Sequence, residues 1–150
     1  MGRIAEKLRG AFTRAGSKDR RIESFEVVVL RLSGMRGVSE YEIVALDGSA
    51  KLTEYGVRFS GEKEERIPKR SVICPAEDVL GLLNRCRILS WDGFHGKHPR
   101  GVKDGKIFSF SATVNGGKTV RAAGSQDFPS HFSDFTDGLN AALRGAERRE

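Results

Sequence analysis

Cysteine is scarce in this 150-residue chain, and long apolar runs are missing from it. Two cysteines are too few for a disulfide framework, so small disulfide-stapled domains are excluded as a class. Cys74 and Cys86 also bracket a predicted helix that begins at Pro75. That helix would separate them by roughly 15 Å, beyond the ~7 Å limit between bridged Cα atoms. The sequence therefore predicts two reduced thiols.

No apolar run approaches the roughly 20 residues that span a bilayer, and the N-terminus lacks the apolar stretch of a secretory signal. We therefore expect a soluble, cytoplasmic protein. The length fits one domain with a real core, and nine Phe among 38% hydrophobic residues argue against a wholly disordered chain.

The net charge of +6 is concentrated at the ends of the chain. Residues 1–21 carry seven basic and two acidic side chains, whereas residues 22–143 carry sixteen of each. This distribution predicts a basic N-terminal arm over 1–21, a single domain over 22–145 and a charged tail over 146–150.

The arm has an amphipathic pattern, because Ile4, Leu8 and Phe12 recur at helical spacing among basic residues. Four interpretations remain open: binding to an anionic membrane surface, binding to nucleic-acid phosphates, a transit-like presequence, or docking of the apolar stripe on the chain's own domain. The residues that would contact an anionic surface or nucleic acid are Arg3, Lys7, Arg9, Arg14, Arg20 and Arg21.

Strand patterns fill the first half of the domain. Residues 25–32 form a β-branched run whose continuous apolar stretch predicts a strand covered on both faces for part of its length. Residues 41–46 and 51–59 predict a hairpin about Asp47-Gly48. Residues 66–73 predict another strand, in which Pro68 favours an edge or a bulge.

After residue 73 the spacing of the apolar residues changes to that of a helix. Pro75 suits the first position of a helix whose buried stripe is Val79, Leu80, Leu82, Leu83 and Cys86. A second hairpin turns at Asn115-Gly116-Gly117, and a last helix begins near Pro129. The predicted fold is α+β: an antiparallel sheet of about five to six strands with two hairpins, two helices packed on one face, and an N-terminal amphipathic helix.

The connection over residues 89–106 is rich in chemically active side chains, and a loop of this length is usually functional or disordered. Its polar and aromatic members are Trp91, Asp92, Phe94, His95, Lys97, His98, Arg100, Lys103, Asp104 and Lys106.

Three kinds of chemistry are weighed for this loop. A hydrolase would use His95 or His98 as a base oriented by Asp92 or Asp104, but no nucleophile lies in a recognised motif. Anion or nucleic-acid binding would use the local excess of basic residues between Gly96 and Lys106.

Zinc binding would need a closer pair of cysteines than the chain offers. The sequence therefore predicts neither a metal nor a cofactor.

A structural alternative also stands for the loop. In that interpretation Trp91 and Phe94 cap the hydrophobic core, while Asp92 and Asp104 form turns with the glycines that follow them. His131 is too isolated in the sequence to be given a role of its own.

The stretch from Val72 to Leu143 resembles uncharacterised bacterial domains of unknown function. These domains share a helix, a Trp-Asp-Gly-Phe segment, an Asp-Gly before a strand, and a Gly-Ser or Gly-Asn with an aromatic-Pro step that opens a final helix. The matching residues here are Trp91 to Phe94, Asp104-Gly105, Gly124-Ser125 and Phe128-Pro129. The resemblance implies that the loop and the start of the last helix form one surface, and it implies no activity.

We therefore expect a small non-catalytic module that binds a protein or a small ligand through the 91–104 loop and the 124–131 segment. The predicted binding residues are Trp91, Asp92, Phe94, Lys97, Arg100, Ser125 and His131.

Overall fold

The structure is a computed structural model, and it describes residues 21–35, 37–96 and 106–149, with side chains up to residue 145. The predicted N-terminal helix and most of the basic arm lie outside these residues. The elements, in chain order, are β2 (Phe25–Gly34), β3 (Gly37–Ala45), β4 (Ser49–Ser60), β5 (Lys63–Pro75), α3 (Ala76–Arg85), the 3₁₀ helix η1 (Ile88–Trp91), β6 (His95–Gly96), β7 (Ile107–Val114), β8 (Lys118–Ser125) and α4 (Phe132–Arg149).

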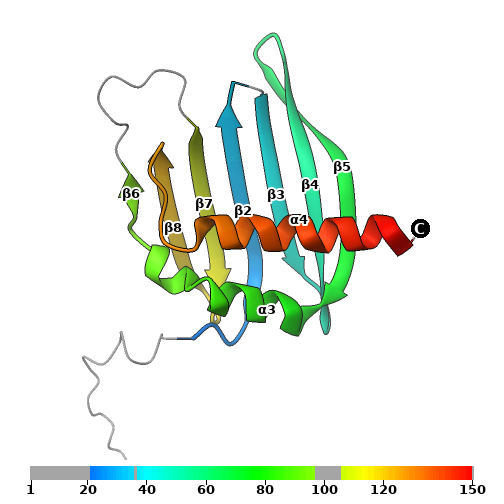
Figure 1. Ribbon diagram of the computed structural model, residues 1–150, viewed down its shortest axis with the longest axis vertical. Helices are drawn as coiled ribbons and strands as arrows, with labels where there is room; N and C mark the ends of the chain where they lie inside the picture. The colour runs from blue at the N-terminus through cyan, green and yellow to red at the C-terminus, as the bar shows by residue number, and fades with distance from the viewer. Residues whose placement is uncertain (1–20, 36, 97–105, 150) are drawn as a thin grey trace, which may run out of the picture.

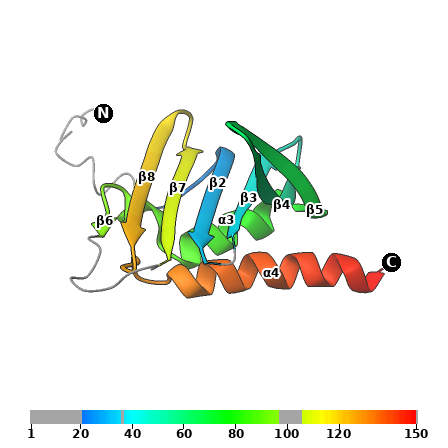
Figure 2. The same cartoon turned by 90° about the horizontal axis from the view of Figure 1, so that it is seen from above.

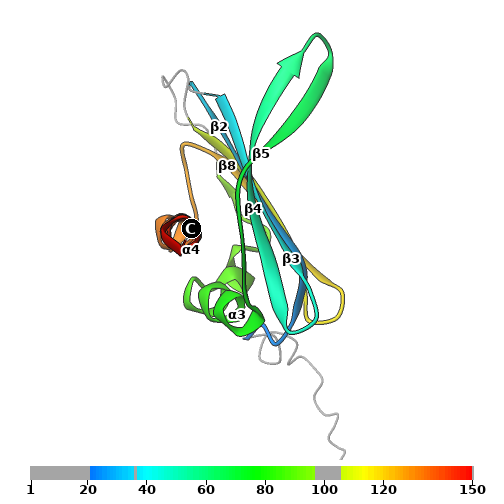
Figure 3. The same cartoon turned by 90° about the vertical axis from the view of Figure 1, so that its right-hand side faces the viewer.

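The strands form one sheet in the order β5-β4-β3-β2-β7-β8-β6, and every neighbouring pair is antiparallel except β6 with β8. Both helices lie on the same face of this sheet, and the opposite face carries no helix of the described chain (Figure 3). The predicted α+β class is confirmed. The expected five to six strands become seven in the described residues, because the 91–104 loop contributes the two-residue strand β6.

The turns follow the local chemistry that predicted them. Gly48 and Gly116 both have positive φ, and so does Asn115 at 49°, which fits the two expected hairpins. Pro68 lies in the edge strand β5, beside a bulge in the β4–β5 pairing, so both roles expected of it are confirmed. The tip of the β4–β5 hairpin bends toward the helix-free side of the sheet (Figure 3).

One expectation about the first strand is wrong. The helices cover only one face of β2, where Val28 and Leu30 are each 1% exposed. Val27 and Val29 point to the helix-free face and are half-buried. The apolar run 27–30 therefore belongs to a central strand with one covered face, because neighbouring strands alone shield part of a valine side chain.

The core lies between the sheet and the two helices. Leu83 of α3, Phe135 and Leu143 of α4 are fully buried, as their helical spacing predicts. The α4 helix crosses the strands and continues past β5, through the predicted domain boundary at residue 145 (Figures 1 and 2).

Two asparagine side chains fix the start of the domain. The Asn84 amide accepts a hydrogen bond from the Ile22 amide at 2.7 Å and donates one to the Ile22 carbonyl at 3.0 Å. Asn115 accepts a hydrogen bond from the Glu23 amide at 2.7 Å and donates one to the Arg21 carbonyl at 3.1 Å. The chain therefore enters the fold beside α3 with its backbone polar groups satisfied.

Candidate functional site

The segment after η1 pairs with the outer edge of β8 through its backbone. The amide of Gly93 donates to the carbonyl of Arg121 at 2.9 Å, and the amide of Ala123 donates to the carbonyl of Phe94 at 3.1 Å. Between these bonds, Asp92 Oδ1 accepts a hydrogen bond from the Arg121 amide at 3.0 Å. Asp92 therefore completes the hydrogen bonding of an edge strand.

Trp91 lies inside the core and has no exposed surface. Its indole Nε1 donates to the carbonyl of Ser130 at 3.0 Å, which ties η1 to the turn before α4. The ring centroid lies 4.9 Å from that of Phe110 and 5.6 Å from that of Phe135. Of the predicted binding residues, Trp91 thus presents no surface to a ligand, and its position matches the alternative in which it caps the core.

The described residues on either side of 97–105 contact the 124–131 segment. Gln126 exchanges hydrogen bonds with the backbone of Lys106, at 2.7 Å and 2.9 Å. At the other end, a Cβ added to Gly96 would lie 2.7 Å from Cβ of Asp127, so only glycine fits this approach. Residues 97–105, which include the predicted site residues Lys97, His98, Arg100 and Asp104, lie outside the described residues.

The proposed histidine–aspartate pair of the loop is not formed by the residues that the structure describes. The His95 side chain is exposed on β6 and makes no hydrogen bond or ion pair with another described residue, while the Asp92 carboxylate accepts a hydrogen bond from β8. A different pair is present at the start of α4, where His131 Nδ1 lies 3.1 Å from Asp134 Oδ2. Both side chains are exposed. Ser125, the last predicted binding residue, is half-buried at the end of β8.

Within the described ranges, no three His, Cys, Asp or Glu side chains are close enough together to hold a metal ion. The cysteines are free thiols, Cys74 half-buried and Cys86 buried. No helix among the described residues is long and apolar enough to cross a membrane.

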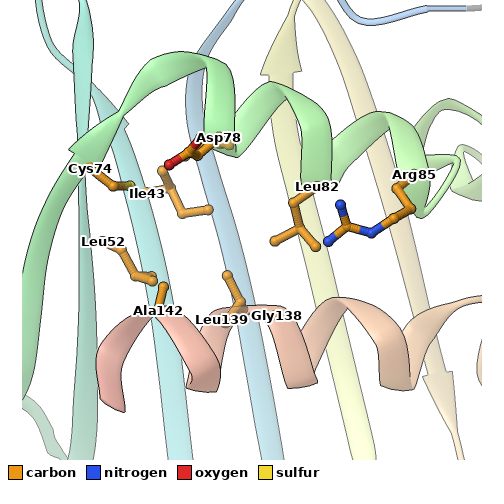
Figure 4. A pocket seen from close by; sticks show the side chains of 10 residues that line it. Ile43, Leu52, Cys74, Asp78, Leu82, Arg85, Gly138, Leu139 and Ala142 are labelled. Atoms are coloured by element: carbon orange, nitrogen blue, oxygen red, sulfur yellow. The ribbon is translucent and has the colours of Figure 1, made fainter. Parts of the chain in front are cut away.

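A groove of about 160 Å³ lies between α3 and α4, which we call the α3–α4 groove (Figure 4). Ile43 and Leu52 of the sheet form its floor. Leu82 lines the α3 side, and Leu139 and Ala142 line the α4 side. The surface that surrounds this space is mainly apolar, and its opening faces the solvent.

The spacing of the two helices explains the groove. A Cβ added to Gly138 would lie 2.7 Å from Cδ1 of Leu82, so the helices touch where one of them has no side chain. Gly138 costs α4 about 1 kcal/mol relative to alanine as a helix residue. Its place in the sequence is explained by this close approach. One turn further, the small side chain of Ala142 leaves space against the sheet.

Two opposite charges stand at the mouth of the groove. Asp78 and Arg85 are seven residues apart and so lie on one face of α3. Both side chains are exposed, and neither side chain forms a hydrogen bond or ion pair with another described residue. In Figure 4 the Arg85 side chain runs back along the groove toward Leu82.

The thiol in the groove is kept neutral. Burial raises the pKa of Cys74, and the nearby Asp78 carboxylate raises it further. Because the thiolate is the nucleophilic form, this environment opposes nucleophilic chemistry at Cys74. Burial likewise raises the pKa of Cys86. The groove therefore offers apolar surface and two free charges at its mouth.

The helix-free face of the sheet holds a second polar cluster, in which the charges are paired with one another. Glu40 is only 8% exposed, and its Oε2 forms an ion pair with Nε of Arg66 at 2.9 Å. Arg31 forms two hydrogen bonds with Glu64, at 2.8 Å and 3.0 Å, and this contact lowers the pKa of Glu64. The Arg66 guanidinium also lies 3.9 Å from the ring centroid of Tyr55. These contacts hold the β4–β5 hairpin against β2 and β3.

The groove was not predicted from the sequence. Leu82 belongs to the predicted buried stripe of the first helix. One signal was present in the sequence: Gly138 and Ala142 put two small residues one turn apart on an otherwise apolar helix face.

Comparison of the chain with protein-family models, with curated proteins and with solved structures finds no match. The resemblance of residues 72–143 to bacterial domains of unknown function therefore stays a prediction.

Proposed function

We propose that the protein is a small non-catalytic binding module whose α3–α4 groove takes the apolar part of a small ligand. The observation that carries this proposal is the volume of about 160 Å³ between Leu82, Leu139 and the sheet. An apolar cavity of roughly 150 Å³ holds a molecule of the size of benzene. Small-molecule sites are mostly apolar, with a few polar groups that orient the ligand, and this description fits the groove and its two mouth charges.

The size of the groove limits the affinity. A ligand with about six to eight non-hydrogen atoms gains at most about 1.5 kcal/mol per atom, and an open groove gains much less. We expect dissociation constants of about 0.1–1 mM for simple apolar probes, which corresponds to about 4–5.5 kcal/mol.

The test is a titration of the full-length protein with toluene, followed by two-dimensional ¹H–¹⁵N NMR. We expect saturable shifts of amides in α3 and α4 that border the groove. In the variant Ala142→Leu, the new side chain fills the space and binding weakens at least tenfold. The matched control is Ala141→Leu, the same substitution at the neighbouring exposed position of α4, which keeps wild-type binding.

Unchanged binding in Ala142→Leu would contradict the assignment of the groove. No saturable shift in the wild-type protein up to the solubility of toluene would overturn the proposed function itself.

A second candidate is the surface expected from the sequence, the 91–104 loop with the 124–131 segment. The observation that favours it is the hydrogen-bonded link between Lys106 and Gln126, with Gly96 closely packed on Asp127. The same titration separates the two sites, because ligand binding there shifts the amides of residues 93–96 and 123–131 instead.

A cytoplasmic location is part of the proposal. The two free cysteines support it, because reduced thiols persist in the cytosol.

A further inference from the structure

We infer that the ligand of the α3–α4 groove is a compact apolar monocarboxylate whose carboxylate binds Arg85, an inference that rests on the proposed function. Arg85 lies in the last turn of α3 and lines the groove. Its guanidinium group lies beside Leu82 at the edge of the apolar space (Figure 4).

Arg85 has no carboxylate partner among the described residues, in contrast to four arginines of the sheet. Arg31, Arg58, Arg66 and Arg70 each lie within 3 Å of a glutamate oxygen. Guanidinium presents five N–H donors in a planar fork that matches both oxygens of a carboxylate. The donors of Arg85 are open to a ligand that approaches from the groove.

The other charges around the groove orient such a ligand. Asp78 lies near Cys74 at the opposite end of the groove, where its charge raises the pKa of that thiol. Asp78 therefore repels a carboxylate from that end. On α4, Asp134 lies close enough to Cys86 to raise the pKa of that thiol, and its carboxylate contacts His131 Nδ1 at 3.1 Å.

The dipoles of the two helices contribute little to the preference for an anionic or a cationic ligand. The C-terminal end of α3 lies beside the N-terminal part of α4, since the two helices run in opposite directions (Figure 1). The negative end of one helix dipole and the positive end of the other therefore oppose each other near Arg85. The preference for a carboxylate depends on the guanidinium group.

The experiment compares three probes of nearly equal shape: pentanoate, pentanamide and pentylamine, which are anionic, neutral and cationic at pH 7. Each is titrated into the full-length protein and followed by amide NMR shifts in α3 and α4. We expect pentanoate to bind at least tenfold more tightly than pentanamide, and pentylamine to bind no better than pentanamide. The advantage of pentanoate shrinks as salt is raised from 20 to 500 mM, because the pair is partly exposed.

The variant Arg85→Gln removes the advantage of pentanoate over pentanamide. The matched control is Arg87→Gln, an exposed arginine two residues further on that does not line the groove, which keeps the advantage. Circular dichroism verifies that both variants fold.

The other possible outcomes of these titrations contradict the inference in different ways. Equal binding of pentanoate and pentanamide, or an advantage that survives in Arg85→Gln, overturns the carboxylate inference while the groove remains a binding site. Tightest binding of pentylamine also overturns it and assigns recognition to Asp78. If none of the three probes binds in the groove, the inference falls together with the proposed function.

Discussion

Replacing Trp91 by alanine should destabilise the protein strongly, because this side chain is fully buried. Loss of a buried tryptophan typically costs 3–5 kcal/mol, through lost apolar burial and the cavity left behind. The variant also loses the contacts of the indole with Phe110, Phe132 and Phe135, and its hydrogen bond to the Ser130 carbonyl. A domain of this size has about 5–15 kcal/mol of stability, so a large share is lost.

The measurement is equilibrium unfolding in urea together with thermal unfolding, both followed by far-UV circular dichroism. A loss of about 4 kcal/mol lowers Tm by about 10–15 °C in a domain of this length. Circular dichroism is needed because Trp91 is the only tryptophan, and its replacement removes the fluorescence signal. In the wild-type protein that fluorescence should be blue-shifted and resistant to quenching by acrylamide.

The matched control is Phe59→Ala, which removes an aromatic side chain that is 59% exposed and should cost less than about 1 kcal/mol. If Trp91→Ala does not fold at all, Trp91→Phe keeps an aromatic ring, loses the N–H donor and should still fold, with a loss of about 1–2 kcal/mol. A Tm within about 3 °C of wild type for Trp91→Ala would refute the burial of this side chain. Trp91 would then be a surface residue, as the sequence-based binding prediction requires.

Two further predictions follow from single side chains. Asn84→Ala removes both hydrogen bonds to the Ile22 backbone and should cost about 1–3 kcal/mol in urea unfolding, with faster hydrogen exchange at the Ile22 amide; unchanged exchange there would show that Asn84 does not hold the start of the domain. Asp78→Asn removes a negative charge that raises the pKa of Cys74, so the pKa falls, the thiolate fraction at pH 8 rises, and alkylation of Cys74 by iodoacetamide becomes faster. The buried Cys86 is the internal control for that reaction, and an equal rate in wild type and variant would contradict the electrostatic contact.

The fold was predictable where a local signal decides the backbone conformation. Asp47-Gly48 and Asn115-Gly116 predicted their hairpins, because Gly48, Asn115 and Gly116 supply the positive φ that such turns need. Pro75 marked the beginning of α3 to within one residue, because it is the N-cap and Ala76 takes the first helical position in which proline was expected. Each of these signals acts within a few residues and needs no information about the rest of the chain.

The strand β6 and the end of α4 were not predictable in this way. His95 and Gly96 form a strand only because β8 offers them an unpaired edge, which depends on residues almost thirty positions away. Gly145 resembles a helix end in the sequence, yet α4 continues to Arg149. Glycine disfavours a helix by about 1 kcal/mol, and that cost is small beside the burial of Phe135, Leu139 and Leu143 on the same helix.

The candidate site moved from the loop to the helices for a related reason. Trp91 and Asp92 drew attention because they are chemically distinctive, and the fold uses the first to fill the core and the second to complete β8. Leu82 looked like an ordinary core residue, because helical spacing is the same for a side chain that packs on a sheet and for one that borders a groove. The difference is decided by Gly138, 56 positions further along the chain, which allows the two helices to touch at one point. A groove between two helices depends on where small residues leave space between them. The sequence of one helix does not show this, because the space is defined by both helices together.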